Sequence, residues 1–338
     1  MTTPVVDGVN VHTVSVVIPV YRGYDTLAGL VAEMEPLFDG AETAEGHRFE
    51  IHEVLLVHDC GPDRSPEVMR RLAEKYDRVR PVWLSRNFGQ HAATLAGMAS
   101  SGGDWIVTLD EDGQHDPAAI PRFLDVAMRE QAALVYARPT NAAPHGALRN
   151  AASRSAKWVF EHLLRGGDLS RFQSYRLVLG EVGRSVAAYA GAGVFLDVAI
   201  GWVNDRTAVC DVELRAEGGR PSGYSTRSLL SHFWRMVLSS GTRGLRLVSM
   251  TGAMFAVLGV LLSAYVVVGR LTGGTQQPGW TSVMVVVLMA SGLVLFSLGV
   301  VAEYVGVAVN MAMGRPPFLI TADLAAGPLG RPPASRRS

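Results

Sequence analysis

Apolar and polar positions follow two regular periods along the first half of the chain. Short β-branched runs predict strands, and each is followed by a segment with apolar residues at helical spacing. The predicted strands are Thr13–Val20, Glu53–Val57, Val79–Leu84, Asp104–Leu109 and Ala133–Ala137. The predicted helices are Asp25–Phe38, Pro66–Tyr76, Gln90–Ala99, Pro117–Glu130 and Gly146–Leu164. Strands that alternate with helices predict an α/β fold with a mostly parallel, Rossmann-like sheet covered on both faces.

The apolar pattern changes in the last third of the chain. Leu247–Gly269 and Thr281–Ala302 are uncharged stretches of about 20 residues, which is long enough to cross a bilayer core. A short polar turn joins them, so the pattern predicts a two-helix transmembrane hairpin. A buried helical hairpin of a soluble protein is the alternative. Arginines gather outside the hairpin, which places both chain ends in the cytoplasm of a multi-pass protein of the cytoplasmic membrane.

A separate helical pattern precedes the hairpin. Leu230, Phe233, Trp234 and Val237 recur on one face. Beside a membrane span, such a face predicts a helix lying in the interface, with packing beneath the soluble domain as the alternative. The expected organisation is therefore an α/β domain (1–226), a juxtamembrane amphipathic helix (227–246), two transmembrane helices (247–313) and a cytoplasmic tail (314–338).

Composition limits the partners and the compartment. The formal net charge is zero and the pI is about 7.1, so nothing indicates nucleic acid as a partner. Cys60 and Cys210 are the only cysteines, which excludes a disulfide framework and fits a reducing compartment. The first ten residues lack the basic start and apolar core of a cleavable signal.

Acidic residues follow two of the predicted strands. Asp110 and Asp112 come after the apolar run 105–109, and Asp59 ends an earlier strand. Open α/β sheets bind ligands at the carboxyl ends of their strands. The oxygens of Asp112 and Gln114 suit Mg²⁺ or Mn²⁺ on a nucleotide diphosphate. A solvated loop is the alternative for such an acidic pair, and Asp116 before a proline is typical of a helix cap.

Polar residues at the neighbouring strand ends are candidate nucleotide ligands. The Asp59 carboxylate is suited to accept the imide N–H of uracil. Its alternative role is helix capping, for which Asp63 is the better candidate. Arg86 and His91 follow another strand end, and a structural role is the alternative for His91.

Several motifs occur in a specific order. They are Ser15–Tyr21, the segment around Asp59, Leu84–His91, Leu109–Gln114, Ala302–Gly306 and Gly314–Ile320. Together they resemble the family 2 glycosyltransferases with a GT-A fold. The ending after two membrane helices resembles the polyprenyl-phosphate glycosyltransferases, which include relatives of dolichyl-phosphate mannose synthase and bacterial enzymes that load sugars onto undecaprenyl phosphate. The resemblance covers roughly residues 13–320.

This resemblance implies inverting transfer of a sugar, from a UDP-linked or other nucleotide sugar to a polyprenyl phosphate, for glycosylation of the cell envelope. The implied nucleotide contacts are Pro19, Tyr21, Asp59, Arg86 and Asp110, and the implied metal ligands are Asp112 and Gln114. The implied catalytic set is Asp110, Asp112, Arg138, Arg149, Ser153 and Arg220, of which the arginines and the serine match the family's acceptor-phosphate residues. Some relatives form tetramers, so a homo-oligomer is a further expected partner.

Three departures from the family pattern bear on this interpretation. His58 stands where a first aspartate is usual, Cys60 and Gly61 stand where glycine and serine are common, and the Gln173–Arg176 stretch lacks its usual aspartate. Leu177 follows Arg176 where processive synthases have tryptophan, which argues against a processive polysaccharide synthase. The other alternative is a non-catalytic membrane protein that binds sugar nucleotides; the Asp112 and Gln114 pair and the arginines argue against it.

Overall fold

The computed structural model describes residues 5–6, 9–141, 173–191, 194–203, 206–215, 279–323 and 325–327, with scattered positions from 252 to 272. These residues divide into two units that are described separately. The first unit holds the α/β sheet and the segment after residue 315, and the second contains the long helix α10 (Trp280–Ala312).

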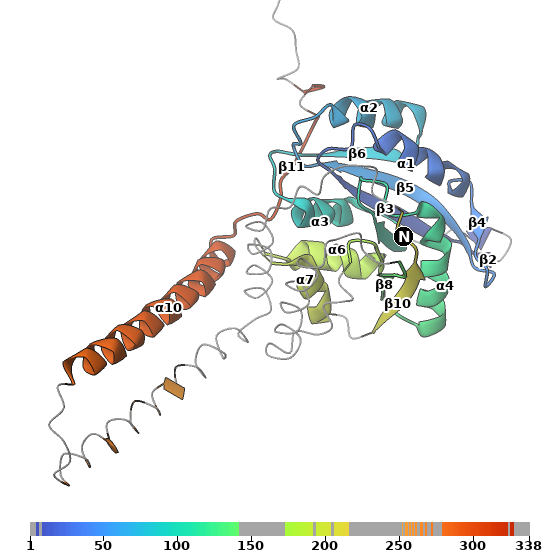
Figure 1. The fold of residues 1–338 in the computed structure, drawn as a ribbon. Helices are drawn as coiled ribbons and strands as arrows, with labels where there is room; N and C mark the ends of the chain where they lie inside the picture. Colours follow the sequence, from blue (N-terminus) through green and yellow to red (C-terminus); the bar gives the residue numbers. More distant parts are fainter. Residues whose placement is uncertain are drawn as a thin grey trace, which may run out of the picture. The chain divides into compact units, whose positions relative to one another are not determined.

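One sheet organises the first unit (Figure 1). Its strands run in the order β10-β8-β9-β7-β3-β5-β6-β11, and β4 pairs with β5. The strands are β3 (His12–Val20), β4 (Ala41–Glu42), β5 (Arg48–His58), β6 (Val79–Leu84), β7 (Trp105–Thr108), β8 (Leu134–Pro139), β9 (Arg176–Leu179), β10 (Thr207–Val212) and β11 (Ile320–Thr321). A separate two-stranded ribbon joins β1 (Val5–Val6) to β2 (Val9–Asn10).

The sheet is mixed, so the prediction of a mostly parallel sheet was wrong in this respect. β3 pairs in parallel with β5 and β7, and β5 with β6, as the alternation predicted. β9 lies antiparallel between β7 and β8, and β11 lies antiparallel on β6. These two strands are only four and two residues long, which is too short to give a periodic signal.

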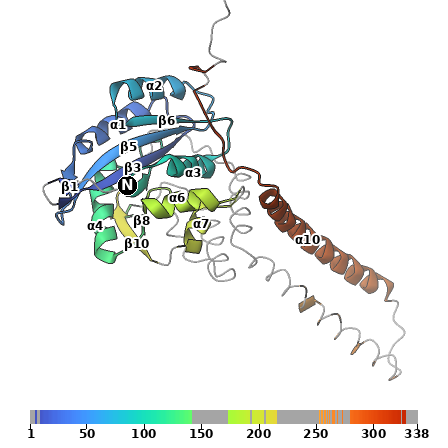
Figure 2. The same cartoon turned by 180° about the vertical axis from the view of Figure 1, so that it is seen from behind.

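Helices cover both faces of the sheet, as predicted. They are α1 (Leu27–Met34), η1 (Glu35–Leu37), α2 (Ser65–Lys75), α3 (Gln90–Ser100), η2 (Pro117–Ala119), α4 (Ile120–Glu130), α6 (Gly180–Tyr189) and α7 (Leu196–Val203). Alternate strand residues face opposite ways, so Val16 and Ile18 pack with α1, α2 and α4, whereas Val17 packs with α3, α6 and α7. Figure 2 shows the same two layers from behind. The predicted helix Gly146–Leu164 lies outside the described residues.

A β-bulge shifts the register between β3 and β5. Val14 pairs with Ile51, but Ser15 pairs with Glu53, so one extra residue is accommodated on β5. The bulge explains why Ile51 and Val54, three residues apart, both enter the same core cluster. It also buries Glu53, whose carboxylate accepts hydrogen bonds from the Ser15 hydroxyl (2.7 Å) and the Gly102 N–H (2.6 Å).

The chain after residue 315 contributes to the sheet of the first unit. β11 pairs Ile320 with Leu84 on β6, and the Arg70 guanidinium binds the Asp323 carboxylate through two hydrogen bonds of 2.6 and 2.8 Å. Phe318 packs against the core cluster beneath α3. Part of the predicted tail therefore forms the edge of the α/β domain.

In the second unit, α10 is a 33-residue helix with exposed apolar side chains along its length, such as Leu295, Phe296 and Leu298. Among the described residues, it is the one helix long and apolar enough to cross a membrane, over the window Met289–Gly306 with mean hydropathy 1.6. The first predicted span, Leu247–Gly269, and the helix 227–246 lie mostly or wholly outside the described residues.

Candidate active site

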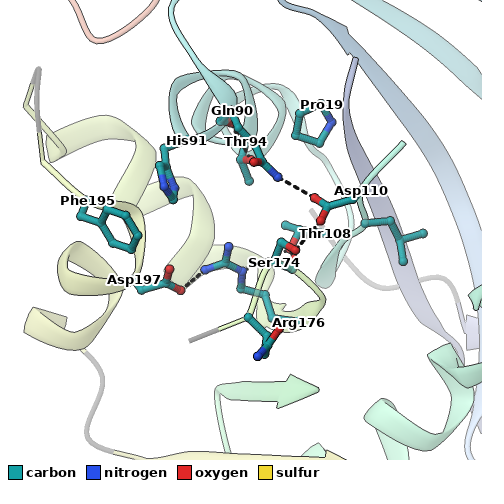
Figure 3. Close-up of a pocket in the computed structure, with 12 residues that line it drawn as sticks. Pro19, Gln90, His91, Thr94, Thr108, Asp110, Ser174, Arg176, Phe195 and Asp197 are labelled. Carbon is teal, nitrogen blue, oxygen red and sulfur yellow. Dashed lines mark hydrogen bonds and ion pairs between the residues drawn. The ribbon is translucent and has the colours of Figure 1, made fainter. Parts of the chain in front are cut away.

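A cleft of about 250 Å³ opens at the carboxyl ends of β3 and β7 (Figure 3). This is the sheet edge at which the acidic strand ends were expected to meet a ligand. The lining residues are Pro19, Gln90, His91, Thr94, Thr108, Leu109, Asp110, Gln173, Ser174, Arg176, Phe195 and Asp197. Two residues predicted to contact the donor, Pro19 and Asp110, are among them.

Asp110 is held at the centre of this cleft by two donors from different elements. Its carboxylate accepts hydrogen bonds from the Gln90 side-chain amide on α3 and the Ser174 hydroxyl before β9, each at 2.6 Å. Its backbone N–H donates to His115 Nδ1 at 3.0 Å. Both carboxylate oxygens accept one hydrogen bond, which fixes their orientation at the cleft.

A buried ion pair forms the opposite wall. Arg176 binds the Asp197 carboxylate on α7, and both side chains are almost fully buried. The Arg176 Nε–H donates to the Thr108 hydroxyl at 3.2 Å, and the Tyr136 hydroxyl donates to Asp197 at 2.9 Å. Such a pair is costly to break, because removal of one partner leaves a buried charge. The sequence singled out the Gln173–Arg176 stretch only by resemblance, and Asp197 was missed because its helix is short and apolar.

Glu111 is a second residue that sequence reasoning missed, since it appeared only as the spacer between Asp110 and Asp112. Its carboxylate accepts the backbone N–H groups of Tyr21 and Arg22, both at 2.8 Å, and so ties the end of β7 to the end of β3. Burial raises the pKa of Glu111 to about 7, although the two N–H donors act in the opposite direction. A contact between a carboxylate and backbone N–H groups about 90 positions away leaves no periodic signal in the sequence.

Asp59 joins the end of β5 to the loop between β6 and α3. Its two carboxylate oxygens accept the N–H groups of Phe88 (2.7 Å) and Gly89 (2.8 Å). Burial raises the pKa of Asp59, and these two hydrogen bonds partly offset that effect. The carboxylate is therefore held in one orientation beside the Gly89–Gln90 start of α3, the helix that supplies one donor to Asp110. The alternative cap role belongs to Asp63, which accepts the Ser65 N–H at 3.1 Å at the start of α2.

Close backbone contact fixes the loop that carries Tyr21. A Cβ atom at Gly61 would lie 1.6 Å from the Tyr21 carbonyl oxygen, so only glycine fits there. The Tyr21 side chain is exposed, and the Arg86 guanidinium lies 4.0 Å from the centre of the Phe88 ring. Both side chains lie near the Asp59 loop, but neither lines the cleft.

Asp112 and Gln114 lie in the turn after β7. The Asp112 carboxylate is exposed and accepts the Gln114 N–H at 3.0 Å, and the Gln114 carbonyl accepts the Arg215 N–H at 3.0 Å. The donor set, one carboxylate and one neutral amide, consists of hard oxygen ligands that fit Mg²⁺ or Mn²⁺. The expected cap is confirmed two residues after Gln114, where Asp116 accepts the Ala118 N–H at 2.9 Å.

The four predicted acceptor-phosphate residues divide into two groups. Arg138 on β8 is exposed and binds Asp211 on β10 through two hydrogen bonds of 2.5 and 2.8 Å. This contact raises the pKa of Arg138 and lowers the pKa of Asp211. Arg149, Ser153 and Arg220 lie outside the described residues.

His91 contacts the cleft from α3, with its ring centre 4.1 Å from that of Phe195. From the sequence, His91 was predicted either to bind the nucleotide or to have a structural role. Its aromatic contact supports the structural role, while its place in the lining keeps it beside any ligand in the cleft.

Comparison with known proteins identifies the family. Residues 15–182 match the model described as Glycosyl transferase family 2. An undecaprenyl-phosphate 4-deoxy-4-formamido-L-arabinose transferase from Pseudomonas paraeruginosa is 31% identical in an alignment 339 positions long, which covers 97% of this chain and 95% of that protein. A protein of the same name from Edwardsiella ictaluri is 29% identical, over 92% of this chain and 94% of that protein.

Solved structures give more distant likenesses. Glucosyl-3-phosphoglycerate synthase from Mycobacterium tuberculosis, in complex with Mn²⁺, uridine diphosphate and glucosyl-3-phosphoglycerate, is 18% identical, with a TM-score of 0.47 over 69% of this chain and 80% of that one. Mannosyl-3-phosphoglycerate synthase from Rubrobacter xylanophilus is 16% identical, with a TM-score of 0.47 over 72% and 75%. On the family match and the nearly full-length relatives, this chain is a glycosyltransferase that belongs to Glycosyl transferase family 2.

Proposed function

We propose that this enzyme transfers a sugar from a nucleotide sugar to a polyprenyl phosphate at the cytoplasmic face of a membrane. The observation that carries the proposal is the similarity of 97% of the chain to transferases named for undecaprenyl phosphate. That similarity extends beyond the sheet and includes α10. The product is a lipid-linked monosaccharide for glycosylation of the cell envelope.

The donor nucleotide binds beside Asp59, Tyr21, Arg86 and Pro19, and its sugar enters the cleft at Asp110. The fixed Asp59 carboxylate supports this assignment, because each oxygen keeps a lone pair for a base N–H after accepting one backbone N–H. A uracil imide suits such an acceptor, so the preferred donor is UDP-linked. The cleft lined by Asp110, Ser174 and Arg176 then holds the sugar.

Asp112 and Gln114 hold the divalent cation, Mg²⁺ or Mn²⁺. When bound, the cation neutralises the diphosphate and so favours its departure. Because Gln114 is neutral, only the Asp112 carboxylate offsets the charge of the cation. The bound cation therefore keeps a net positive charge that can act on the diphosphate. The exposed position of Asp112 in the turn after β7 supports this role.

The acceptor phosphate binds Arg138, Arg149, Ser153 and Arg220. Arginine suits this task because its planar guanidinium binds two phosphate oxygens and stays charged. A phosphate monoester with a second pKa of about 6 is largely dianionic at neutral pH, so its oxygen attacks the anomeric carbon without a strong general base. A single displacement of this kind inverts the configuration of the sugar.

The membrane part consists of two helices with both ends in the cytoplasm. α10 supports the second span, since 33 residues at 1.5 Å per residue give roughly 50 Å, more than the core of a bilayer requires. We further propose, from the sequence pattern, that residues 227–246 form a helix in the membrane interface. We propose that these membrane segments also form the contacts of a homo-oligomer, such as a tetramer.

Isolated membranes test the proposal. They are incubated with a panel of radiolabelled UDP- and GDP-sugars, with Mg²⁺ or Mn²⁺, and the lipids are extracted. The expected result is label in one lipid product that mild acid releases as a monosaccharide, dependent on this protein. Label that accumulates in a long polysaccharide, or lipid labelling that is equal in membranes with an Asp112→Asn variant, would contradict it.

A further inference from the structure

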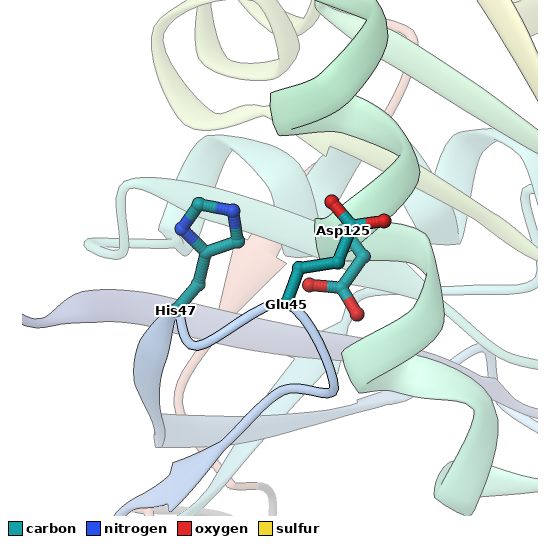
Figure 4. A group of neighbouring side chains, drawn as sticks. All are labelled: Glu45, His47 and Asp125. Carbon is teal, nitrogen blue, oxygen red and sulfur yellow. The ribbon is translucent and has the colours of Figure 1, made fainter.

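A second cluster of metal-ligating side chains lies at the opposite edge of the sheet from the active-site cleft (Figure 4). Glu45 and His47 belong to the turn between β4 and β5, at the amino end of β5, and Asp125 belongs to the middle of α4. One ligand atom from each of the three side chains lies within 4.8 Å of the other two. The cleft is at the carboxyl ends of the strands, so this cluster takes no part in it.

Asp125 gives the strongest sign of a missing ligand. Asp125 is only 6% exposed, and its neighbours Phe123, Leu124 and Val126 on α4 are buried as well. Within the part of the chain that the structure describes, no donor reaches its Oδ1 atom. A buried carboxylate without a partner costs several kcal/mol if charged, so natural proteins supply a counter-charge.

The turn holds the other two ligands in place. The backbone N–H of His47 donates to the Thr43 hydroxyl at 3.1 Å, and the Gly46 N–H donates to the Thr43 carbonyl at 3.0 Å. Arg129, one turn beyond Asp125 on α4, pairs with the Glu45 carboxylate. This arginine compensates Glu45 and links the turn to α4, but among the described residues no donor reaches Asp125 Oδ1.

The ligand types select a class of ion. Two carboxylates alone would suit Mg²⁺ or Ca²⁺, but an imidazole favours borderline ions such as Zn²⁺. A second imidazole is near, since the His12 ring centre lies 6.0 Å from that of His47. We infer that Glu45, His47 and Asp125 form a binding site for a divalent transition-metal ion, best filled by Zn²⁺, which fastens the β4–β5 turn to α4. Ligand bonds of about 2.0–2.2 Å require the three side chains to close slightly around the ion.

The site is structural, because it is remote from the cleft and joins the β4–β5 turn to α4, which the Arg129–Glu45 ion pair also links. A filled site therefore stabilises the fold by mass action without a change in the reaction. It is distinct from the proposed Asp112 and Gln114 site, which binds its ion together with the donor.

Metal binding by the full-length protein in detergent tests this inference. The protein is treated with chelator, dialysed against micromolar Zn²⁺ alone, and assayed for bound zinc and for its melting temperature. All variants carry Asp112→Asn, so that zinc at the proposed catalytic site does not contribute. The expected result is one zinc per chain and a higher melting temperature, with binding weakened at least tenfold by His47→Gln and by Asp125→Asn.

His52 provides the matched control, since it is an exposed histidine on β5 beside Glu50. His52→Gln is expected to bind zinc as the parent does. Circular dichroism in the absence of metal establishes that the His47 and Asp125 variants are folded, and Glu45→Gln serves in place of either one that is not. Equal zinc binding by the parent and the His47→Gln variant, or no zinc in the parent, would overturn the inference.

Discussion

Asp110, Glu111 and Asp112 are adjacent in the chain, yet each has a different environment. Asp110 is engaged by two side-chain donors, Glu111 by two backbone N–H groups, and Asp112 is exposed in the turn. Three consecutive carboxylates thus serve the cleft, the scaffold and the proposed metal site. Because their environments differ, substitution of each residue is expected to affect a different property of the protein.

The Asp112→Asn variant is expected to lower kcat/KM by at least about 100-fold, because it removes the only charged ligand of the proposed cation. The optimum metal concentration should rise as well. Initial rates measured against Mg²⁺ and Mn²⁺ concentration test this. Asp116→Asn is the control, since asparagine also caps a helix and Asp116 lies outside the cleft. Metal dependence that is unchanged in Asp112→Asn would refute the assignment.

Glu111 is expected to make stability depend on pH. Its folded-state pKa, about 7, exceeds the ordinary value of 4.5, so the folded protein holds a proton that the unfolded chain releases. The contribution of Glu111 to the free energy of unfolding is therefore complete below about pH 4.5. It is lost as the pH rises through 7, and the loss amounts to up to about 3 kcal/mol.

Melting temperatures of the solubilised protein from pH 5 to pH 8 measure this effect. Glu111→Gln should flatten the decline, because glutamine does not titrate, whereas Glu67→Gln on the exposed face of α2 should preserve it. A decline of equal slope in the wild type and the Glu111→Gln variant would show that another group is responsible.

At the scale of elements, strands β8 and β10 position Arg138, the first of the arginines proposed to bind the acceptor phosphate. Arg138 and Asp211 are register partners on these parallel strands, and their ion pair is exposed to solvent. Exposed ion pairs contribute little to stability, so Arg138 can exchange Asp211 for a phosphate at small cost. In the proposed function, Asp211 competes with the acceptor phosphate for the Arg138 guanidinium.

Substitution of either partner should change the KM for polyprenyl phosphate in opposite directions. Arg138→Ala is expected to raise it at least tenfold, and Asp211→Asn to lower it a few-fold, with the KM for the nucleotide sugar unchanged in both. Steady-state kinetics with each substrate varied in turn measure this. Arg64→Ala, which breaks a similar exposed pair on α2, is the control. A parallel rise in both KM values for Arg138→Ala would indicate a general structural defect.

At the scale of the whole molecule, the segment after α10 completes the sheet edge. β11 covers β6, Arg70 binds Asp323, and Phe318 packs in the core. A protein that ends at Gly314 would expose β6 as an unpaired edge strand and lose these contacts. It should therefore melt several degrees lower and aggregate more readily.

A matched truncation isolates this effect. A protein that ends at Gly327 keeps β11 and Asp323 and should melt like the full chain. Thermal unfolding followed by light scattering compares the two. Equal melting temperatures would mean that the strand contributes nothing to the stability of the domain.

The sequence by itself determined the local elements and the family. Periodicity identified α2, α3 and α4 and the strands β3, β6, β7 and β8 within a few residues, because these elements bury regular faces. It predicted only the second half of β5, and it did not predict the parallel strand β10. Strand-end acids located the ligand edge, since the carboxyl ends of parallel strands meet there. The second apolar run identified α10, because a charge-free run of that length is itself the signal.

The tertiary structure alone decided which distant residues meet. Nothing in the local pattern joins Asp110 to Ser174, or Arg176 to Asp197, because contacts across 21 to 64 positions depend on how the sheet is ordered. The antiparallel strand β9 brings Ser174 and Arg176 to the cleft, and β11 returns the chain to β6. Glu45, His47 and Asp125 likewise form a cluster only because α4 crosses the β4–β5 turn. The spacing of apolar residues along the sequence determines the helices and strands. The packing of their apolar faces against one another then determines which distant side chains form a site.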